Sequence, residues 1–387
     1  MVFVDFYPYV PPSVWMRVRP DAVTVWDDED VKRRLDWYYR VMNDKAPAKF
    51  LIAKIVDAGE NPAKLDLDGL WDLHHRLSSE HRRLWKEAIR GELELKEVLN
   101  RGSRPDYNFL HVKVEIAKRV LRSCRFCERK CSVNRYKHIG GCFLDWKTYV
   151  HSWFHHLGEE APLVPSGTIF YGGCNFRCVY CQNYDISQVT PRSGSPISAR
   201  QLAQIQYELR VHGARNINHV GGDPTPNIHT ILESLLYLEV NVPQLWNSNM
   251  YLSLEGIELI KDIIDIWLPD FKYGNNKCAT RLSAAPKYFE TVTRNLKIAV
   301  ENGDMIIRHL VLPGHLECCT KPILKWIAEN LPRDKVLVNI MDQYRPEHLV
   351  TKYPHMWPEL RRRPSAAEVS EAFEYARKLG LRFEPVS

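Results

Sequence analysis

Short apolar runs alternate with amphipathic stretches from about residue 165 to the end of the chain. The apolar runs show little internal alternation, which is typical of strands buried on both faces of a parallel sheet. They predict six strands, at 168–171, 217–220, 244–246, 266–268, 305–311 and 336–340. The amphipathic stretches predict a helix capped by Ser198, and further helices at about 229–240, 254–264, 286–302, 319–330 and 366–379.

Regular alternation of strand and helix predicts an α/β fold with right-handed crossovers. Six such units are too few for a complete eight-unit barrel. We therefore expect a curved, partial (βα)6 barrel of the TIM type over residues 161–387. In such sheets the functional groups gather at the carboxyl ends of the strands.

The first 115 residues follow a different pattern. Residues 1–28 are rich in proline and aromatic side chains and are expected to be irregular, whereas 29–100 are expected to be mainly helical. One helix face is marked by apolar residues at three-, four- and seven-residue steps, with Asp68 as its expected N-cap. These residues are Leu70, Leu73, Leu77, Leu84 and Ala88. We expect a mainly helical extension over 1–115, with a helix end and linker at 100–105, and a small metal-binding segment over 116–160.

A polar or glycine-marked cluster follows every predicted strand. The six clusters are the loop containing Cys174, then Gly221-Gly222-Asp223, Asn247-Ser248-Asn249, Asp270-Phe271-Lys272, Arg308 with the Pro313-Gly314-His315 turn, and Asp342-Gln343-Tyr344. Because parallel strands end at the same edge of a sheet, these clusters are predicted to share one rim.

The loop after the first of these strands holds three cysteines within eight residues, Cys174, Cys178 and Cys181, spaced C-x3-C-x2-C. Thiolates are soft ligands that suit iron–sulfur clusters and zinc. Three thiolates on a 4Fe–4S cluster leave one iron without a protein ligand, and an open position distinguishes a catalytic metal from a structural one. A zinc site or a chance grouping is the alternative interpretation.

With an aromatic residue, Tyr180, before the last cysteine, this loop resembles the radical S-adenosylmethionine (radical SAM) superfamily. The resemblance implies that the open iron chelates SAM, and that an electron from the cluster cleaves SAM to give a 5′-deoxyadenosyl radical. Gly221, Gly222 and Asp223 stand where the family has a Gly-Gly-Glu motif that contacts the SAM amino group. This chain carries the shorter Asp in place of Glu.

The later strands resemble those of the pyruvate formate-lyase activating enzymes. The resemblance implies that "IIRHLVLPGH" (306–315) places Arg308 beside SAM and that "LPDFKY" (268–273) places Asp270 and Lys272 at the pocket. "NSNM" (247–250) stands where that group has Asp-Thr-Asn-Gly and supplies Ser248 and Asn249. Over about 120–385 the chain is most similar to a PflX-like subgroup of iron–sulfur proteins.

The resemblance implies an enzyme of the oxidoreductase type that activates or modifies a protein or peptide, with an electron donor such as ferredoxin or flavodoxin. The alternative target is a nucleic acid or a small metabolite. A third hypothesis is a non-enzymatic module that binds zinc or clusters and nucleic acid.

A second cysteine group, Cys124, Cys127, Cys131 and Cys142, has the spacing C-x2-C-x3-C-x10-C. Four thiolates complete a site, either as structural zinc or as an auxiliary 4Fe–4S cluster. Both interpretations stay open, and the need for an electron route near the first group favours the cluster.

The remaining candidates receive structural interpretations. Cys318 and Cys319 are interpreted as small buried residues that begin a helix; the alternatives are a thiol that relays a hydrogen atom and a metal ligand. Cys278 is interpreted as a packing residue. His151, His155 and His156 suit a metal only if they are helical, so structural roles are favoured.

Composition limits the location and the partners. Apolar residues make up 45% of the chain and no run of 18 apolar residues occurs, so no membrane span is expected. The start of the chain lacks a signal-peptide pattern, so we expect a cytoplasmic protein.

Residues 101–150 hold 12 Lys and Arg against 4 Asp and Glu, a local excess of +8 in a chain of net charge +6. A solvated helix with charges that offset an anionic cluster is the favoured interpretation, and nucleic-acid binding is the alternative.

Overall fold

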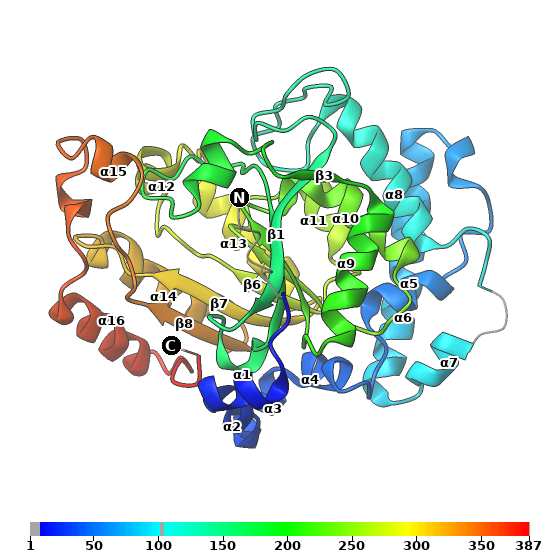
Figure 1. The fold of residues 1–387 in the computed structure, drawn as a ribbon, viewed down its shortest axis with the longest axis horizontal. Helices are drawn as coiled ribbons and strands as arrows, with labels where there is room; N and C mark the ends of the chain where they lie inside the picture. Colours follow the sequence, from blue (N-terminus) through cyan, green and yellow to red (C-terminus); the bar gives the residue numbers. More distant parts are fainter. Residues whose placement is uncertain (1–7, 101–103, 387) are drawn as a thin grey trace, which may run out of the picture.

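The fold is built on one eight-stranded sheet with the strand order β3-β1-β2-β4-β5-β6-β7-β8. The structure is a computed structural model that describes residues 8–100 and 104–386. Figure 1 shows the strands turning from the steep β1 to the nearly level β7 and β8, so the sheet is strongly curved. Six strands are parallel and follow one another in sequence, as expected for a partial barrel. They are β2 (Ser166–Tyr171), β4 (Ile217–Gly221), β5 (Gln244–Ser248), β6 (Ile266–Pro269), β7 (Asp304–Leu310) and β8 (Val336–Met341).

Two further strands extend the sheet on the β2 side, and the sequence analysis did not anticipate them. β1 (Thr148–His156) pairs antiparallel with β2 and with the short β3 (Ser195–Ile197). The three histidines of "HSWFHH" therefore lie on a strand, not on a helix. His155 is buried, and its Nδ1 accepts a hydrogen bond of 3.1 Å from the Val10 backbone N–H.

The crossover helices lie where the amphipathic pattern places them. They are α9 (Ala199–Val211), α10 (Ile228–Tyr237), α11 (Leu254–Ile260), α13 (Tyr288–Val300), α14 (Lys321–Asn330) and α16 (Ala366–Lys378). The Ser198 side chain caps α9 by accepting a hydrogen bond from the Gln201 backbone N–H, as the sequence predicts. Helix α12 (Asn276–Ser283) and the short α15 (Leu349–Lys352) were not predicted.

The N-terminal part is helical from an earlier point than expected. Helices α1 (Pro12–Val18) and α2 (Asp21–Thr24) lie in the stretch predicted to be irregular. They are followed by α3 (Glu29–Arg34), α4 (Asp36–Met42), α5 (Lys49–Ile55), α6 (Leu67–Arg90), α7 (Leu95–Asn100) and α8 (Phe109–Val120). The N-cap of α6 is Asp66, whose side chain accepts from the Gly69 N–H at 2.8 Å, so the assignment to Asp68 was wrong by two residues. The linker predicted at 100–105 falls partly outside the described residues.

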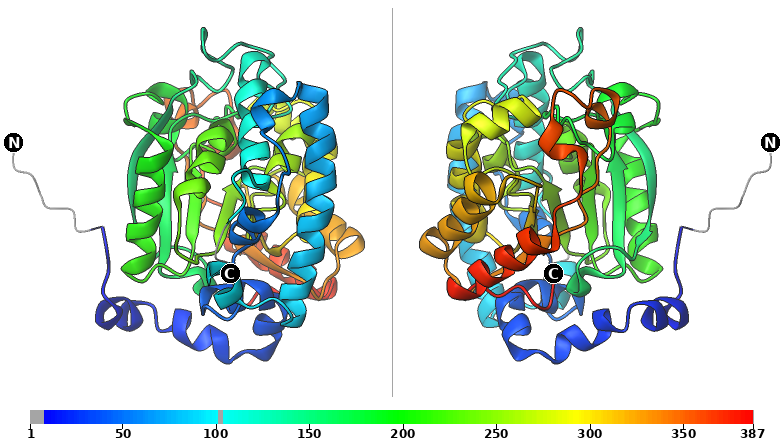
Figure 2. Two further views of the ribbon diagram at one scale, coloured as in Figure 1. Left: turned by 90° about the vertical axis from the view of Figure 1, so that its right-hand side faces the viewer. Right: turned by 90° about the vertical axis from the view of Figure 1, so that its left-hand side faces the viewer.

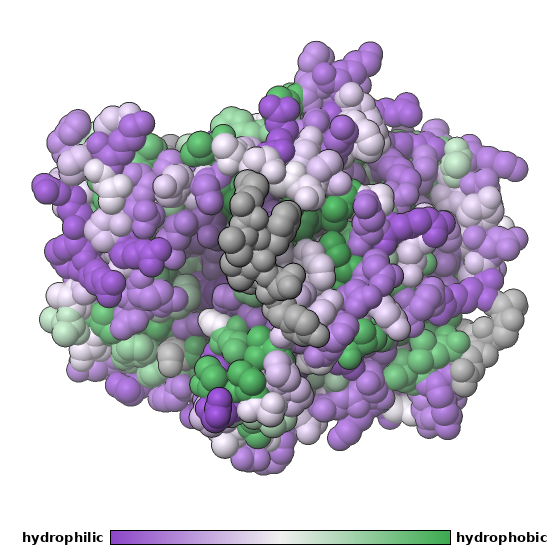
Figure 3. All heavy atoms as spheres, in the orientation of Figure 1, coloured by the Kyte–Doolittle hydropathy of each residue, from purple (hydrophilic) through white to green (hydrophobic). Residues whose placement is uncertain are grey.

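One continuous apolar core joins these helices to the sheet. Leu70 and Leu77 of α6 belong to the same buried cluster as Trp246 of β5 and Trp267 of β6, whose side chains are fully buried. Figure 2 shows α5, α6 and α8 stacked on the outside of the sheet, with α1 to α4 running along one end of it. The surface seen in Figure 3 is mostly hydrophilic, with small apolar areas. Within the described ranges, no helix combines the length and the apolar character that a membrane crossing requires.

Candidate active site

The loops after β2 and β4 are in backbone contact at the carboxyl edge of the sheet. The Asp223 N–H donates to the Gly173 carbonyl at 2.9 Å, and the Gly222 N–H donates to the Tyr171 carbonyl at 2.8 Å. A Cβ at Gly222 would lie 2.1 Å from the Gly173 oxygen, and Gly173 itself has φ +79°. Only glycine fits such an approach and such a backbone angle. The two glycine motifs therefore lock the cysteine loop to the neighbouring strand.

The cysteine loop is buried and its sulfur atoms are hydrogen-bonded. Cys174 and Cys178 are buried and Cys181 is half-buried. The Cys174 sulfur accepts from the Phe176 N–H at 3.3 Å, and the Cys178 sulfur accepts from the Ser283 hydroxyl at 2.9 Å. Burial raises the pKa of the Cys178 thiol to about 11, although the Lys272 ammonium works in the opposite direction. A bare Cys178 thiol stays protonated, and a bound metal would have to supply the charge that deprotonates it.

Asp223 holds the loop after β5 in place. Its Oδ2 accepts from the Ser248 hydroxyl at 3.1 Å and from the Asn249 N–H at 3.0 Å, and its Oδ1 accepts from the Thr225 N–H at 2.9 Å. The Asn249 amide in turn donates to Asn175 of the cysteine loop at 2.7 Å. Burial raises the pKa of the Asp223 carboxyl above its ordinary value, against these hydrogen bonds. The carboxylate therefore connects three strand ends.

The segment after β6 brings Lys272 and Asp270 to the same edge, beside Arg308 of β7. Lys272 Nζ lies 2.7 Å from Asp270 Oδ2, and the backbones of Asp270 and Arg308 pair in an isolated parallel β-bridge. Burial alone would lower the pKa of Lys272, but the Asp270 carboxylate raises it above its ordinary value, with Cys178 and Cys181 acting in the same direction. The ammonium thus remains charged beside the cysteine loop.

Arg308 lies in a buried ion-pair network that the sequence did not reveal. Its Nε is 2.6 Å from Glu160 Oε1, its Nη2 contacts both Glu160 and Glu159, and its Nη1 donates to the Asn247 amide oxygen at 3.3 Å. Asn339 of β8 also donates to Glu160, at 2.8 Å. Burial opposes ionisation of Glu159, but Arg308 and His156 lower its pKa to about 2. Both glutamates precede β2 by a few residues, and no motif marks them.

The residues predicted to hold the cluster and SAM line one cavity of about 270 Å³, whereas the Pro313-Gly314-His315 turn, Asp342 and Tyr344 do not line it. The predicted residues that line it are Cys174, Cys178, Tyr180, Cys181, Gly221, Gly222, Asp223, Ser248, Asn249, Asp270, Lys272 and Arg308. A polar cavity of about 540 Å³ adjoins it and shares Gln182, Asn183, Val220, Asn247, Arg308, Met341 and Gln343. Glu159, Glu160, His156 and Asp342 line only this second cavity. The Asn247 Nδ2, which is buried between the two, has no hydrogen-bond partner among the described residues.

The four-cysteine segment packs against the cysteine loop. Arg177 donates to the Gly141 carbonyl, and Arg129 donates to the Asn175 carbonyl and to the Ala284 carbonyl. Arg135, with 1% of its surface exposed, donates to the Pro226 carbonyl at 2.7 Å. Cys124 and Cys142 are buried, Cys127 is half-buried and Cys131 is exposed. The two cysteine groups are therefore neighbours in space.

Most of the basic residues between 101 and 150 have partners within the chain. Lys113 pairs with Asp262, Lys118 with Glu233, and Arg104 with Glu239. Ion pairs or carbonyl contacts also engage Arg119, Arg125, Arg129, Lys130 and Arg135. Such pairing leaves less positive charge for a nucleic acid than the local excess implies.

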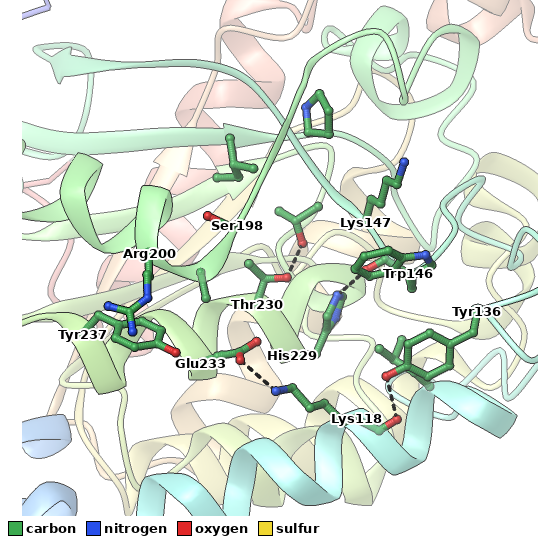
Figure 4. Close-up of a pocket in the computed structure, with 15 residues that line it drawn as sticks. Lys118, Tyr136, Trp146, Lys147, Ser198, Arg200, His229, Thr230, Glu233 and Tyr237 are labelled. Carbon is green, nitrogen blue, oxygen red and sulfur yellow. Dashed lines mark hydrogen bonds and ion pairs between the residues drawn. The ribbon is translucent and has the colours of Figure 1, made fainter.

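A third cavity, of about 590 Å³, lies beside the four-cysteine segment, away from the strand-end cluster. Figure 4 shows its labelled residues on α8, α9, α10 and the chain before β1. Lys118 and Glu233 form an ion pair of 2.7 Å across it, and Arg200 stacks on the Tyr237 ring at 4.1 Å. Lys118 and Glu233 thus neutralise each other, and none of the predicted rim residues lines this cavity.

The spacing of donor atoms separates two kinds of metal site. In the described part of the chain, two groups of three or more donors have all their ligand atoms within 4.8 Å of one another: Cys278, His315, Cys318 and Cys319, and His74, His75 and Glu258. Neither the three-cysteine loop (Cys174, Cys178 and Cys181) nor the four-cysteine group (Cys124, Cys127, Cys131 and Cys142) is among them. One zinc ion holds its ligands close together, whereas a cluster of several irons is larger and needs them farther apart. In neither of these two cysteine groups do three sulfur atoms all lie within 4.8 Å of one another.

Comparison with known proteins decides the family. The sequence profile of the radical SAM superfamily matches residues 168–327, which contain the cysteine loop and β2 to β7. An uncharacterized protein of Methanocaldococcus jannaschii, MJ0674, is 42% identical over 353 residues, 90% of this chain and 98% of that protein. Residues 168–327 form a radical SAM superfamily domain.

Solved structures resemble this chain over only part of their length. Streptococcus suis SuiB bound to S-adenosylmethionine is 14% identical and covers 54% of this chain and 47% of its own, with a TM-score of 0.40. SuiB bound to its precursor peptide SuiA is 15% identical and covers 54% of this chain and 46% of its own, with a TM-score of 0.38. The chain thus spans about half the length of these structures.

Proposed function

We propose that this radical SAM protein cleaves S-adenosylmethionine reductively at a 4Fe–4S cluster held by Cys174, Cys178 and Cys181. One observation carries the proposal: the three thiols line the same cavity as the polar groups from the ends of four other parallel strands. A cluster with three protein ligands keeps an open iron, and the rim provides the groups that a charged, polar ligand of that iron requires. When bound, the cluster supplies the electron that splits SAM into methionine and a 5′-deoxyadenosyl radical.

In this proposal the chain's own residues bind SAM, orient it and shield the cluster. The Ser283 hydroxyl and the Lys272 ammonium lie beside the cluster ligands and offset their negative charge. Asp223 fixes Ser248 and the Asn249 backbone at the cavity wall, and the carbonyls of the glycine motif remain close to the same wall. Arg308, anchored by Glu159 and Glu160, stands at the boundary between the two cavities.

For the second cysteine group we propose an auxiliary 4Fe–4S cluster. Two observations support iron over zinc: no three of its sulfur atoms all lie within 4.8 Å of one another, and the segment contacts the three-cysteine loop through Arg177 and Arg129. An electron from a donor such as ferredoxin or flavodoxin could then reach the first cluster through the second.

As the target we propose a protein or peptide, on the strength of the likeness to activating enzymes and to the PflX-like subgroup. The oxidoreductase class and the activase type rest on the same likeness. The acceptor group would enter the 540 Å³ cavity, where the unpartnered Asn247 Nδ2 is available as a donor. The size and polarity of that cavity also favour a second candidate, a small polar metabolite.

Anaerobic reconstitution tests the radical chemistry. The wild-type chain, given iron, sulfide, dithionite and SAM, should form 5′-deoxyadenosine. Cys178→Ala should abolish the product, whereas Cys127→Ala, the matched substitution in the other group, should retain it with dithionite and lose about four irons. Equal 5′-deoxyadenosine from wild type and Cys178→Ala would refute the proposal.

The target is tested by isotope transfer. A candidate substrate grown with deuterium at its carbon positions should pass deuterium to 5′-deoxyadenosine. We expect transfer from the protein fraction of the native host. Transfer from the small-molecule fraction instead would overturn the protein target in favour of a metabolite.

A further inference from the structure

Three cysteines and a histidine meet outside the two cysteine groups described above. Cys278 lies in the first turn of α12, His315 follows the turn after β7, and Cys318 and Cys319 lie in the π-helical turn Leu316–Thr320. Their ligand atoms all lie within 4.8 Å of one another. From the sequence, Cys278 was expected to be a packing residue and the Cys318-Cys319 pair the start of a helix. In the chain, 40 residues separate Cys278 from Cys318.

The distances match those of a tetrahedral ion. Cys318 Sγ lies 3.9 Å from Cys278 Sγ and 3.9 Å from Cys319 Sγ. His315 Nδ1 lies 3.3 Å from Cys318 Sγ, 3.7 Å from Cys278 Sγ and 3.9 Å from Cys319 Sγ. Zinc–sulfur bonds of about 2.3 Å and zinc–nitrogen bonds of about 2.05 Å at tetrahedral angles place the sulfurs about 3.8 Å apart, and the nitrogen about 3.6 Å from each.

The surroundings also suit a metal site. His315 and Cys319 are buried, and Cys278 and Cys318 are half-buried. With Nδ1 facing the sulfurs, the other ring nitrogen of His315 lies 3.7 Å from Glu359 Oε1. A carboxylate behind a ligating histidine is a common second-sphere partner that orients the ring. The Asn275 side chain accepts from the Cys278 N–H at 2.8 Å and donates to the Cys318 carbonyl at 2.7 Å, which fixes both cysteine backbones.

We propose that Cys278, His315, Cys318 and Cys319 bind one zinc ion in a closed tetrahedral site. Binding converts three thiols to thiolates and leaves the imidazole neutral, and the protons pass to solvent. All four positions are protein ligands, so the site is structural and leaves no open coordination position. Three thiolates and one imidazole are soft and borderline ligands, which favour zinc over magnesium or calcium.

The ion would fasten α12 to the turn after β7. The far end of α12 supports the three-cysteine loop, because the Leu282 carbonyl accepts from the Val179 N–H and the Ser283 carbonyl accepts from the Arg177 N–H, each at 2.9 Å. Zinc at one end of this helix therefore stabilises the position of the cluster loop at the other. The zinc assignment does not rest on the proposed SAM cleavage, because the two sites have no ligand residue in common.

Zinc analysis and zinc-edge X-ray absorption test the site on the full-length chain. The Cys127→Ser/Cys131→Ser variant serves as the background, so that no zinc in the four-cysteine segment obscures the result. We expect about one zinc per chain, with three sulfurs at about 2.3 Å and one nitrogen at about 2.0–2.1 Å. No bound zinc, or a shell without nitrogen, would overturn the proposal.

A histidine pair supplies the matched substitutions. In the same background, His315→Ala should lower zinc to less than about a tenth of its level, whereas His355→Ala, at an exposed position, should leave it unchanged. Retention of zinc by His315→Ala would contradict the assignment. If His315→Ala does not fold, the zinc-edge absorption spectrum of the background protein still shows whether zinc has three sulfur ligands and one nitrogen ligand. A disulfide between Cys278 and Cys318 in the purified protein, found by peptide mapping after alkylation, would also overturn it.

Discussion

The hydroxyl of Ser283, the last residue of α12, donates a hydrogen bond of 2.9 Å to the sulfur of Cys178. Ser283 is fully buried, and its oxygen also receives the Tyr273 hydroxyl at 2.5 Å. Hydrogen bonds to ligand sulfurs are among the features that set the potential of an iron–sulfur cluster. A helix absent from the sequence prediction thus contacts the proposed catalytic cluster.

Ser283→Ala should make the reduction potential of the three-cysteine cluster more negative, because the reduced cluster is the more anionic state and loses a hydrogen-bond donor that stabilises it. The measurement is a redox titration followed by electron paramagnetic resonance in the Cys127→Ala background. Thr280→Ala, at an exposed position on the same helix, is the control and should leave the potential unchanged. An unchanged potential in Ser283→Ala would contradict a role for this hydrogen bond.

The sheet and its functional edge were predictable because their signals are local. A parallel strand buried on both faces appears as an unbroken apolar run, and the polar cluster that follows it needs no knowledge of distant residues. The cysteine loop, Gly221-Gly222-Asp223 and Asp270-Phe271-Lys272 could therefore be assigned to one rim. Helix ends are less sharply encoded, as the shift of the α6 cap from Asp68 to Asp66 illustrates.

Contacts between distant segments were not predictable. Glu160 lies 148 residues before Arg308, and only the fold brings the two together. Structural roles were favoured for the three histidines of β1, with metal binding expected only on a helix; they lie on a strand, which turns the successive His155 and His156 to opposite faces. Cys278 and Cys318 approach each other only because α12 and the turn after β7 lie side by side, and a lone cysteine carries no spacing signal.

Asp223→Ala should weaken SAM binding about 10- to 100-fold, because hydrogen bonds to a charged group contribute about 1.5–3 kcal/mol and this carboxylate positions Ser248 and Asn249. Equilibrium dialysis of SAM with the anaerobically reconstituted protein measures the effect. Asp223→Asn keeps one acceptor oxygen and should restore part of the affinity. The iron content of both variants should equal that of the wild type; loss of iron would instead indicate a structural collapse of the loop.

Lys113→Ala should lower the free energy of unfolding by about 3–5 kcal/mol, because it leaves the buried Asp262 carboxylate without its partner. Lys113 Nζ lies 2.8 Å from Asp262 Oδ2, and the two side chains are 0% and 4% exposed. The pair joins α8 to the segment that follows α11, across the interface between the N-terminal helices and the barrel. Denaturant titration monitored by circular dichroism measures the change.

Lys118→Ala provides the comparison for Lys113, because Lys118 lies on the same helix and forms a 2.7 Å ion pair with Glu233. The Lys118 side chain is 43% exposed, so its removal should cost at most about 1 kcal/mol. Equal losses in the two variants would show that burial of the Lys113 pair does not determine its contribution.

Asp304→Asn should flatten the dependence of thermal stability on pH between about pH 4 and pH 8. Burial, together with the nearby Asp36 and Asp265, raises the pKa of Asp304 to about 8 in the folded chain, from an ordinary value of 3.8. The folded state therefore holds a proton that the unfolded state releases, and this contribution to stability is lost as pH rises through about 8. Asparagine imitates the neutral carboxyl and keeps an oxygen to accept from the Tyr38 N–H, which lies 2.7 Å from Asp304 Oδ2.

Scanning calorimetry of wild type, Asp304→Asn and the exposed control Asp72→Asn should show a shallower decline of stability with pH in Asp304→Asn alone. Parallel declines in all three proteins would mean that other groups control stability in this range.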